Sequence, residues 1–348
     1  MGPIGGGGIY PFSTMKTEEI ESEVGRSRSR LILVLRMAVS AAMLAVLISR
    51  VPREELSNLW RDWDPARITW LLTALGLTAG SVLLAALRWR QVLKALGLRV
   101  RTHRLLSLHL AGLFVSNFLP STIGGDVLRV RRLSRQTDDP PAAFASVIIE
   151  RLTGWLVLPM LTITGLLVNP SLLRLGAASS TALILVGTTL LLVLAVVYIA
   201  EHDRVGRRLQ GSSGAIRRQL AAVHLGLSHL RDHPRDLRRL VGIGISYQTT
   251  LVVATAMAGR AVGIDLGPTA WLAFAPAVLI AQVFPLSVGG LGIREGALVL
   301  FLGPLGVTNA EAIALGLLIY AINLLVSLAG APSFAMGHRR SEPVGAAR

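Results

Sequence analysis

Long apolar segments alternate with short arginine-rich segments along most of this 348-residue chain. A membrane helix rises about 1.5 Å per residue, so about 20 apolar residues cross the roughly 30 Å hydrocarbon core of a bilayer. Six apolar segments reach or approach that length. The pattern therefore predicts six full transmembrane helices, at about 31–49, 68–87, 142–168, 181–200, 241–262 and 310–334.

A twelve-residue sequence occurs twice, each time interrupting an apolar segment. Residues 118–129 read FLPSTIGGDVLR and residues 283–294 read VFPLSVGGLGIR, so the copies align at a constant offset of 165 residues, from 118 to 283. Paired broken segments in the two halves of a membrane chain indicate a substrate site near the bilayer midplane. The residues expected to break the backbone are Pro120, Gly124 and Gly125 in the first copy, and Pro285, Gly289, Gly290 and Gly292 in the second.

The basic residues predict how the first copy is oriented. The apolar segment 105–123 follows Arg101 and Arg104 and precedes Arg129 and Arg131, so the positive-inside rule makes both of its flanks cytoplasmic. A segment that enters and leaves on one side is re-entrant. Broken backbone is tolerated within a membrane where protein buries it or where it lines a cavity, which fits such an element.

Parity gives the second copy the opposite orientation. Three full spans separate the copies, and the last span ends inside because Arg339 and Arg340 follow it. The second copy is therefore expected to enter and leave from the external face. The predicted fold class is an all-α polytopic membrane protein: about six full transmembrane helices plus two oppositely oriented re-entrant elements, forming an inverted repeat, with both termini in the cytoplasm.

The remaining segments predict the domain layout. Residues 1–30 are expected to be a disordered cytoplasmic tail that starts at Met1 or Met15, residues 31–335 one transmembrane domain, and residues 336–348 a second cytoplasmic tail. The cytoplasmic loop 201–240 carries apolar residues at helical spacing, namely Ile216, Leu220, Val223, Leu227 and Leu230. This spacing predicts an amphipathic helix, which lies either on the inner membrane surface or against the bundle.

Composition supports the membrane assignment and excludes several kinds of site. The chain is 52% hydrophobic and 16% charged, with a mean hydropathy of +0.59. It has no cysteine, which excludes disulfides, thiol nucleophiles and thiolate metal sites. The net charge of +15 lies beside the apolar spans, where it sets topology and meets anionic lipids, so we expect no nucleic-acid partner.

A small set of ionisable and polar residues falls within or beside the apolar segments. A charge at the centre of a membrane helix costs roughly 2.5 to 3.5 kcal/mol on insertion scales, so these side chains are expected to face a cavity or one another. They are Asp126, Arg129, Glu150, Arg151, Arg294 and Glu295, with Asn117, Gln282 and Asn323 as polar lining.

Adjacency limits how these charges pair. Glu150 and Arg151 follow one another on a helix and point roughly 100° apart, so neither is simply the partner of the other. The pairs that remain are Glu150 with Arg129 or Arg294, and Arg151 with Asp126 or Glu295.

The cationic members of this set favour phosphate binding. Arg129, Arg151 and Arg294 are expected to bind a lipid phosphate, because arginine offers a planar fork and the half-helices after each Gly-Gly pair point positive N-terminal ends at the break. Asp126, Glu150 and Glu295 would neutralise these arginines when no lipid is bound. The alternative is that the charges only form structural salt bridges.

Three functions remain open at this stage. The first is a lipid flippase or transporter, the second a membrane enzyme that uses Asp126 or Glu150 on a lipid phosphate, and the third a scaffold that recruits a glycosyltransferase or other transferase through loop 201–240. No GxSxG elbow, Walker lysine or metal-ligand spacing is present in the sequence, so we predict no catalytic residue, no metal and no cofactor. The oligomeric state stays open.

Three motifs in order carry a family resemblance: NFLPSTIGGDVLR, ASVIIERLTGW and FPLSVGGLGIREGA. Over about residues 31–335 the chain resembles the lysylphosphatidylglycerol synthase transmembrane region family, also described as flippase-like or UPF0104 integral membrane proteins. The resemblance implies a domain of the bacterial inner membrane that handles anionic or aminoacylated lipids, or polyprenyl-linked glycans in some relatives. Only fourteen residues follow Phe334, so we expect the lipid-handling part without the soluble aminoacyl-transferase domain.

Overall fold

The computed structural model describes residues 45–46, 49, 64–118, 124–201, 215–282 and 290–336 of the chain, and every regular element in these residues is helical. Two 3₁₀ segments, η1 Pro170–Arg174 and η2 Gly303–Leu305, join α-helices. The α-helices are α3 Pro65–Ala95, α4 Thr102–Phe118, α5 Gly124–Thr137, α6 Pro140–Val168, α7 Ala177–Glu201, α9 Ala215–Asp232, α10 Pro234–Val262, α11 Pro268–Ala281, α12 Ile293–Leu302, α13 Asn309–Leu328 and α14 Ala331–Met336.

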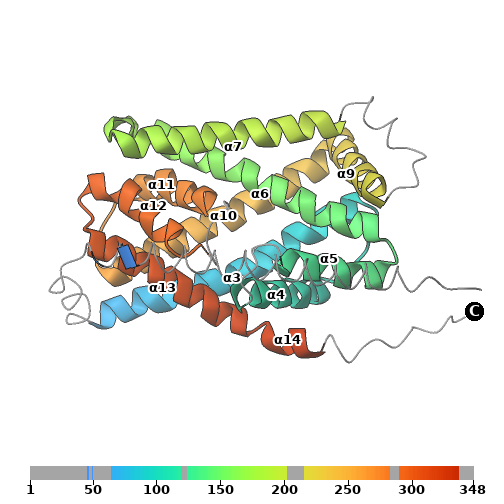
Figure 1. Cartoon of the computed structure of the whole chain (residues 1–348), viewed down its shortest axis with the longest axis horizontal. Helices are drawn as coiled ribbons and strands as arrows, with labels where there is room; N and C mark the ends of the chain where they lie inside the picture. Colours follow the sequence, from blue (N-terminus) through green and yellow to red (C-terminus); the bar gives the residue numbers. More distant parts are fainter. Residues whose placement is uncertain are drawn as a thin grey trace, which may run out of the picture.

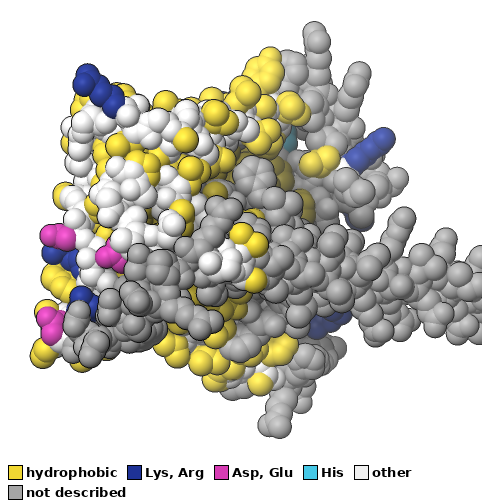
Figure 2. Space-filling view, turned by 60° about the vertical axis from the view of Figure 1, so that its left-hand side comes forward, with side chains coloured by type: hydrophobic (Ala, Val, Ile, Leu, Met, Phe, Trp, Pro, Cys, Tyr) yellow, Lys and Arg dark blue, Asp and Glu magenta, His cyan; other side chains and the backbone are white. Residues whose placement is uncertain are grey.

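Five helices in the described residues, α3, α6, α7, α10 and α13, are long and apolar enough to cross a membrane. They run along the long axis of the bundle (Figure 1), and hydrophobic side chains cover much of the described surface in Figure 2. This confirms an all-helical membrane protein, and the five helices overlap five of the six predicted spans. The first predicted span, 31–49, lies almost entirely outside the described residues, as do the tails 1–30 and 337–348.

Caps in the sequence explain where several helices begin and end. The Asp64 carboxylate accepts a hydrogen bond from Arg67 N (2.8 Å), and Pro65 follows it at the first helical position of α3. The Asp139 carboxylate caps α6 in the same way through Ala142 N (3.0 Å). At the end of α10, Gly263 adopts a left-handed conformation with φ 106°, which glycine accepts without steric strain.

Two helical hairpins lie in opposite halves of the bundle. Helix α4 packs against α5, and α11 packs against α12. In Figure 1, α4 and α5 lie in the right half, whereas α11 and α12 lie in the left half. The tips of the hairpins, 119–123 and 283–289, lie outside the described residues together with Pro120, Pro285 and Gly289.

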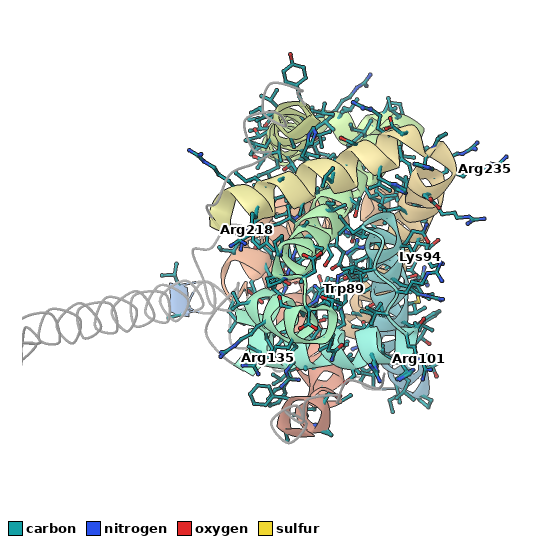
Figure 3. All side chains as sticks on the ribbon, turned by 90° about the vertical axis from the view of Figure 1, so that its right-hand side faces the viewer. Trp89, Lys94, Arg101, Arg135, Arg218 and Arg235 are labelled. Carbon is teal, nitrogen blue, oxygen red and sulfur yellow. The ribbon has the colours of Figure 1, made fainter. Side chains whose placement is uncertain are left out.

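The two ends of the bundle differ in charge. Arginine and lysine side chains gather at the right-hand end of Figure 1, which faces the viewer in Figure 3. We call this the basic end and define it by the labelled residues Lys94, Arg101, Arg135, Arg218 and Arg235. Helix α9 and the open end of the α4–α5 hairpin lie here.

The predicted amphipathic segment forms helix α9, which was expected either on the inner membrane surface or against the bundle. Val223, Leu227 and Leu230 are buried against Val92 and Ile149 of α3 and α6, so α9 packs on the bundle. Leu220 remains about half exposed, and the side chain of Ile216 lies outside the described residues. The predicted loop 201–240 extends too far, because helix α10 begins at Pro234.

The last span also ends earlier than predicted. Helix α13 begins at a capping box, in which Thr308 and Glu311 cap each other, and it ends at Leu328. A turn at Ala329–Gly330 then redirects the chain into the short helix α14. The apolar run to Phe334 hid this break, because Gly330 packs against the Leu110 backbone of α4, which no hydrophobic pattern reveals.

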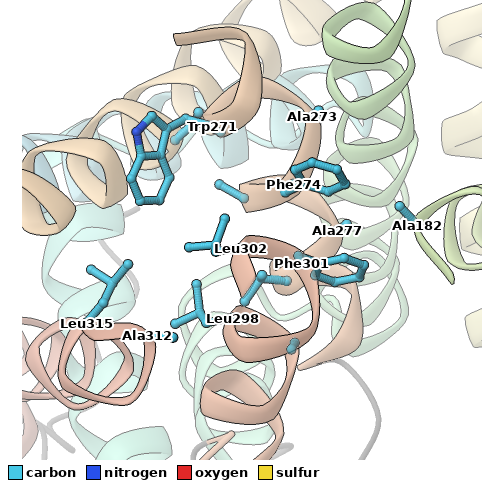
Figure 4. Packing of buried hydrophobic residues seen from close by; sticks show 14 of the residues in the cluster. Ala182, Trp271, Ala273, Phe274, Ala277, Leu298, Phe301, Leu302, Ala312 and Leu315 are labelled. Carbon is cyan, nitrogen blue, oxygen red and sulfur yellow. The ribbon is translucent and has the colours of Figure 1, made fainter. Parts of the chain in front are cut away.

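The largest apolar cluster fixes the α11–α12 hairpin against the long helices (Figure 4). Phe274 and Phe301 stack with ring centroids 5.6 Å apart, and both are almost fully buried. Trp271 packs onto α10 at Gly259, where an added Cβ would lie 2.6 Å from the indole ring. Glycine at this position therefore lets a large aromatic side chain lie directly on a helix backbone.

Glycines also bring α4 and α5 into direct contact. Gly124 and Gly125 form the first turn of α5, and Gly125 faces Gly112 of α4. A Cβ at Gly125 would lie 2.2 Å from Ser116 Oγ and 2.3 Å from the Gly112 carbonyl oxygen. The second Gly of the first repeat therefore permits close helix packing, which is a role that small residues have in membrane bundles.

Replacing Gly125 with alanine should separate this hairpin. We expect Gly125→Ala to lower the free energy of unfolding by about 1–3 kcal/mol, because the added methyl group overlaps α4. Thermal unfolding of the detergent-solubilised protein measures the change. The matched control is Gly76→Ala on α3, whose added methyl group meets nothing within 4 Å. Equal melting temperatures for the two variants would contradict the assigned contact.

Candidate functional site

Five charged side chains form a continuous row across α3, α5 and α6. Glu150 lies between Arg88 (Nη2 to Oε1, 3.1 Å) and Arg129, whose Nη2 contacts Oε2. Arg129 also reaches Asp126 (3.2 Å), and Asp126 in turn binds Arg151 (2.7 Å). The signs alternate from Arg88 to Arg151, and three guanidinium groups face two carboxylates. We call these five residues the charge row.

The charge row passes from the protein interior to its surface. The side chains of Arg88, Arg129 and Glu150 are 3–7% exposed, whereas Asp126 is 21% and Arg151 is 48% exposed. A charge removed from water needs both a partner and hydrogen bonds, so the three inner residues depend on one another. The outer pair of Asp126 and Arg151 remains accessible from outside the bundle.

Aromatic rings cover the two inner arginines. The Arg129 guanidinium carbon lies 4.1 Å from the centroid of the Trp89 ring, and that of Arg88 lies 4.6 Å from the Tyr247 ring. Trp89 is itself held by a hydrogen bond from its indole Nε1 to Ser146 Oγ (3.0 Å). The rings add cation–π attraction and fix the guanidinium planes.

Several hydrogen-bonding groups beside the charge row have no protein partner among the described residues. These buried atoms are Arg88 Nε and Nη1, Arg129 Nε, His109 Nδ1 and Gln248 Oε1. Gly154 of α6 lies against this group, since a Cβ there would sit 3.2 Å from Arg88 Nη1. Buried donors without an acceptor are costly, so the site is incomplete without further acceptors.

The second copy of the repeat holds its arginine differently. Arg294 Nε donates to Gln282 Oε1 (3.0 Å), Arg294 Nη1 donates to the Gly316 carbonyl oxygen (3.4 Å), and the guanidinium lies 5.8 Å from the Tyr320 ring. These contacts lie among α11, α12 and α13. Arg294 therefore belongs to the other hairpin and does not join Arg129 and Arg151.

Glu295 caps helix α12. Its Oε2 accepts a hydrogen bond from Gly292 N (2.5 Å), while Gly290 and Gly292 have φ angles of +76° and +85° that favour glycine. Gly316 of α13 gives this fully buried carboxylate its space, because an added Cβ would lie 2.7 Å from Glu295 Cγ. Two of the predicted break residues thus shape the turn that precedes α12.

A cavity of about 120 Å³ lies next to the charge row, between α3, α4, α10, α11 and α13. His109 and Tyr247 line it on the side of the row, and Asn323 lines it from α13. Asn117, which was also predicted as lining, donates from Nδ2 to the Asn323 carbonyl oxygen (3.4 Å) and links α4 to α13. Within the described part of the chain, no group of three His, Cys, Asp or Glu residues could hold a metal ion.

The sequence identified most of the charge row and missed its inner end. Of the pairs left open, Glu150–Arg129 and Arg151–Asp126 form. Arg88 falls just outside the predicted span 68–87 and was therefore not among the predicted site residues. The helical spacing of the apolar residues Trp89, Val92 and Leu93 could have revealed that α3 continues to Ala95. All three are buried, so the inward face of the helix extends past Arg88.

These observations define a multi-pass helical membrane protein with a buried charged site. The family model of the lysylphosphatidylglycerol synthase TM region matches residues 33–330, and the chain belongs to that family. This match confirms the family indicated by the three sequence motifs.

Two curated relatives are similar over most of the chain. It is 25% identical to a protein named glycosyltransferase AglD from Haloferax volcanii over 88% of its own length, and it spans only 54% of that relative. It is 26% identical to a UPF0104 membrane protein from Methanothermobacter thermautotrophicus, over 80% of this chain and 87% of the relative.

Removing the central carboxylate tests whether the charge row depends on it. We expect Glu150→Gln to lower the free energy of unfolding by about 3–5 kcal/mol, because Arg88 and Arg129 then lose their shared buried counter-charge. The control Asp232→Asn breaks the exposed pair with Arg231 and should cost under about 1 kcal/mol. If both variants melted at the same temperature in detergent, the row would not be a unit of the fold.

Proposed function

We propose that this protein binds the phosphate of an anionic lipid or polyprenyl-phosphate-linked headgroup at the charge row and carries it across the membrane. The observation that carries this proposal is the set of buried guanidinium N–H groups without an acceptor on Arg88 and Arg129. The row has three guanidinium groups and only two carboxylates, so it is short of one negative charge and of acceptor oxygens. A phosphate supplies both.

The exposure gradient along the row suggests a route for the headgroup. Arg151 is the accessible arginine and meets the phosphate first, while Asp126 competes for the same guanidinium through bonds of 2.7 and 2.9 Å to Oδ2. As the phosphate moves inward, it replaces a carboxylate at each arginine in turn, and the carboxylate returns when the phosphate has passed. This stepwise exchange keeps every buried charge compensated during movement.

The hairpins supply the access from two sides that such transport needs. We propose that α4–α5 and α11–α12 are oppositely oriented re-entrant elements of the membrane. By the positive-inside rule, the basic end then lies on the cytoplasmic side of the cell membrane. Arg294, held by Gln282 and the backbone of α13, is the counterpart that receives the phosphate from the other face. In this proposal Arg151 and Arg294 are the two ends of the pathway.

The arrangement of the acids speaks against the enzymatic alternative. Asp126 and Glu150 are each bound by two arginines, so both carboxylates are already engaged in ion pairs and neither is free to act on a substrate.

Converting Arg88 to lysine tests phosphate binding with little change in charge. Arg88→Lys keeps a cation beside Glu150 and removes the Nε and Nη1 donors, so we expect anionic-lipid affinity to fall about tenfold. Lipid translocation in proteoliposomes should fall with it. The control Arg260→Lys changes the exposed pair with Asp265 at the other end. Unchanged affinity in Arg88→Lys, in a protein that melts normally, would count against the proposal.

A second candidate function is membrane support for a glycosyltransferase. It is favoured by the match to about half of a relative that is named a glycosyltransferase. In this proposal the basic end binds the acidic surface of a transferase, and the charge row holds the lipid phosphate that the transferase modifies.

Neutralising the basic end separates this role from transport. We expect Arg218→Gln combined with Arg235→Gln to release a co-purified transferase activity toward polyprenyl phosphate, because both side chains lie at the basic end. Lipid translocation should stay unchanged, and Arg260→Gln at the opposite end should retain the partner. Retention of the activity by the double variant would reject this surface.

A further inference from the structure

The cavity beside the charge row shares Tyr247 and His109 with the phosphate site, and the rest of its lining is not used by that site. Its wall is mostly apolar, with contributions from Val82, Leu113, Leu251 and Ile319. The polar side chains in the wall are Thr78, Ser81, His109, Tyr247, Thr255 and Asn323. An apolar wall with a few placed polar groups is typical of a small-molecule site.

The hydrogen bonds of these polar residues determine what the cavity offers a ligand. Thr78 Oγ1 donates to the Ala74 carbonyl oxygen (2.8 Å), Ser81 Oγ donates to that of Thr78 (2.7 Å), and Thr255 Oγ1 donates to that of Leu251 (2.9 Å). Each hydroxyl hydrogen is thereby used within its own helix, and the lone pairs remain.

Asn323 follows the same pattern. Its Nδ2 donates to the Ile319 carbonyl oxygen (2.9 Å), which leaves Oδ1 as an acceptor. The four residues Thr78, Ser81, Thr255 and Asn323 therefore offer acceptors, which suits a ligand group that carries hydrogen-bond donors.

Charge decides which kind of donor fits. Among the described residues that line the cavity, none is aspartate or glutamate. The neighbouring row carries three guanidinium groups against two carboxylates, and the Arg88 guanidinium stacks on Tyr247, a wall residue. An ammonium group in the cavity would find no carboxylate in the wall and would compete with the guanidinium groups of the row for the single negative charge of the phosphate, which is unfavourable. Neutral hydroxyl groups meet the same acceptors without that cost.

The volume limits the size of the group. A cavity of about 150 Å³ holds one benzene molecule, which has six heavy atoms. At about 120 Å³, this cavity fits a glycerol-sized group and no whole lipid.

We infer that the cavity receives the uncharged, hydroxyl-bearing part of the headgroup, a small polyol esterified to the phosphate held by the charge row. This inference rests on the proposed function and narrows its substrate class. It favours headgroups that carry a glycerol-sized polyol, as phosphatidylglycerol does. It disfavours aminoacylated and other ammonium-bearing lipids, including the lysyl lipid in the name of the family.

Lipid retention by the purified protein tests the inference. The protein is delipidated and incubated with phosphatidylglycerol, phosphatidylethanol or phosphatidylethanolamine of identical chains, and bound lipid is measured by native mass spectrometry. Phosphatidylethanol has the same single negative charge as phosphatidylglycerol and no hydroxyl groups. We expect phosphatidylglycerol to bind about fivefold or more tightly than phosphatidylethanol, because each lost hydrogen bond costs about fivefold in affinity. Phosphatidylethanolamine should bind least, because it carries an ammonium group and no net negative charge.

Two variants assign this preference to the cavity. Combining Thr255→Val with Asn323→Leu should bring the ratio of phosphatidylglycerol to phosphatidylethanol close to one and leave phosphatidylethanol binding unchanged. The matched control is Thr250→Val, because Thr250 lies on the same helix, donates to its own Ser246 carbonyl oxygen (2.8 Å) and does not line the cavity.

The outcomes separate the inference from the proposed function. Equal binding of the three lipids, preference for phosphatidylethanolamine, or an unchanged ratio in the double variant would overturn the polyol assignment. Loss of anionic-lipid binding in Arg88→Lys alongside any of these results would still support the phosphate site. Phosphatidylinositol tests the size limit: weaker binding than phosphatidylglycerol supports a glycerol-sized group, and equal or stronger binding would overturn that limit.

Discussion

The cost of burying charge in a membrane bundle governs the rest of this structure. Glu150 is 2% exposed and lies between two buried arginines, so α3, α5 and α6 must remain together for any of the three charges to be compensated. The requirement extends outward, because Arg129 also binds Asp126 and thereby links α5 to Arg151 on α6. One row of ion pairs thus fixes the first hairpin against two membrane-length helices.

Small residues provide the space that these contacts need. Gly112 and Gly125 allow α4 and α5 to touch, which places Arg129 over Trp89, and Gly316 leaves room for the buried carboxylate of Glu295. Helices in lipid gain little from the hydrophobic effect between them, so close packing and polar contacts hold them together. The glycines of the repeat therefore serve the geometry of the charges as well as the turns at Gly290 and Gly292.

The sequence predicted what periodicity and charge encode directly. Hydropathy located the long helices, and spacing on α6 showed that Glu150 and Arg151 need different partners, which the structure supplies as Arg129 and Asp126. It failed where a residue acts through a contact distant in sequence. Arg88 is 62 residues from Glu150, and its flanking arginines concealed it. The end of α13 depends likewise on the contact of Gly330 with Leu110.

The two copies of the repeat provide different environments for the same arginine. Both guanidinium groups lie near an aromatic ring of a long helix, Trp89 for Arg129 and Tyr320 for Arg294. Arg129 binds two carboxylates, whereas Arg294 binds the neutral acceptors of Gln282 and Gly316, and Glu295 is turned to its capping role. In the proposed transport, an anion would displace carboxylate oxygens at Arg129, whereas at Arg294 it would meet the Gln282 and Gly316 oxygens as well. Under that proposal, these different partners would make the two copies bind the same headgroup unequally, whereas equal copies would bind it equally from either side.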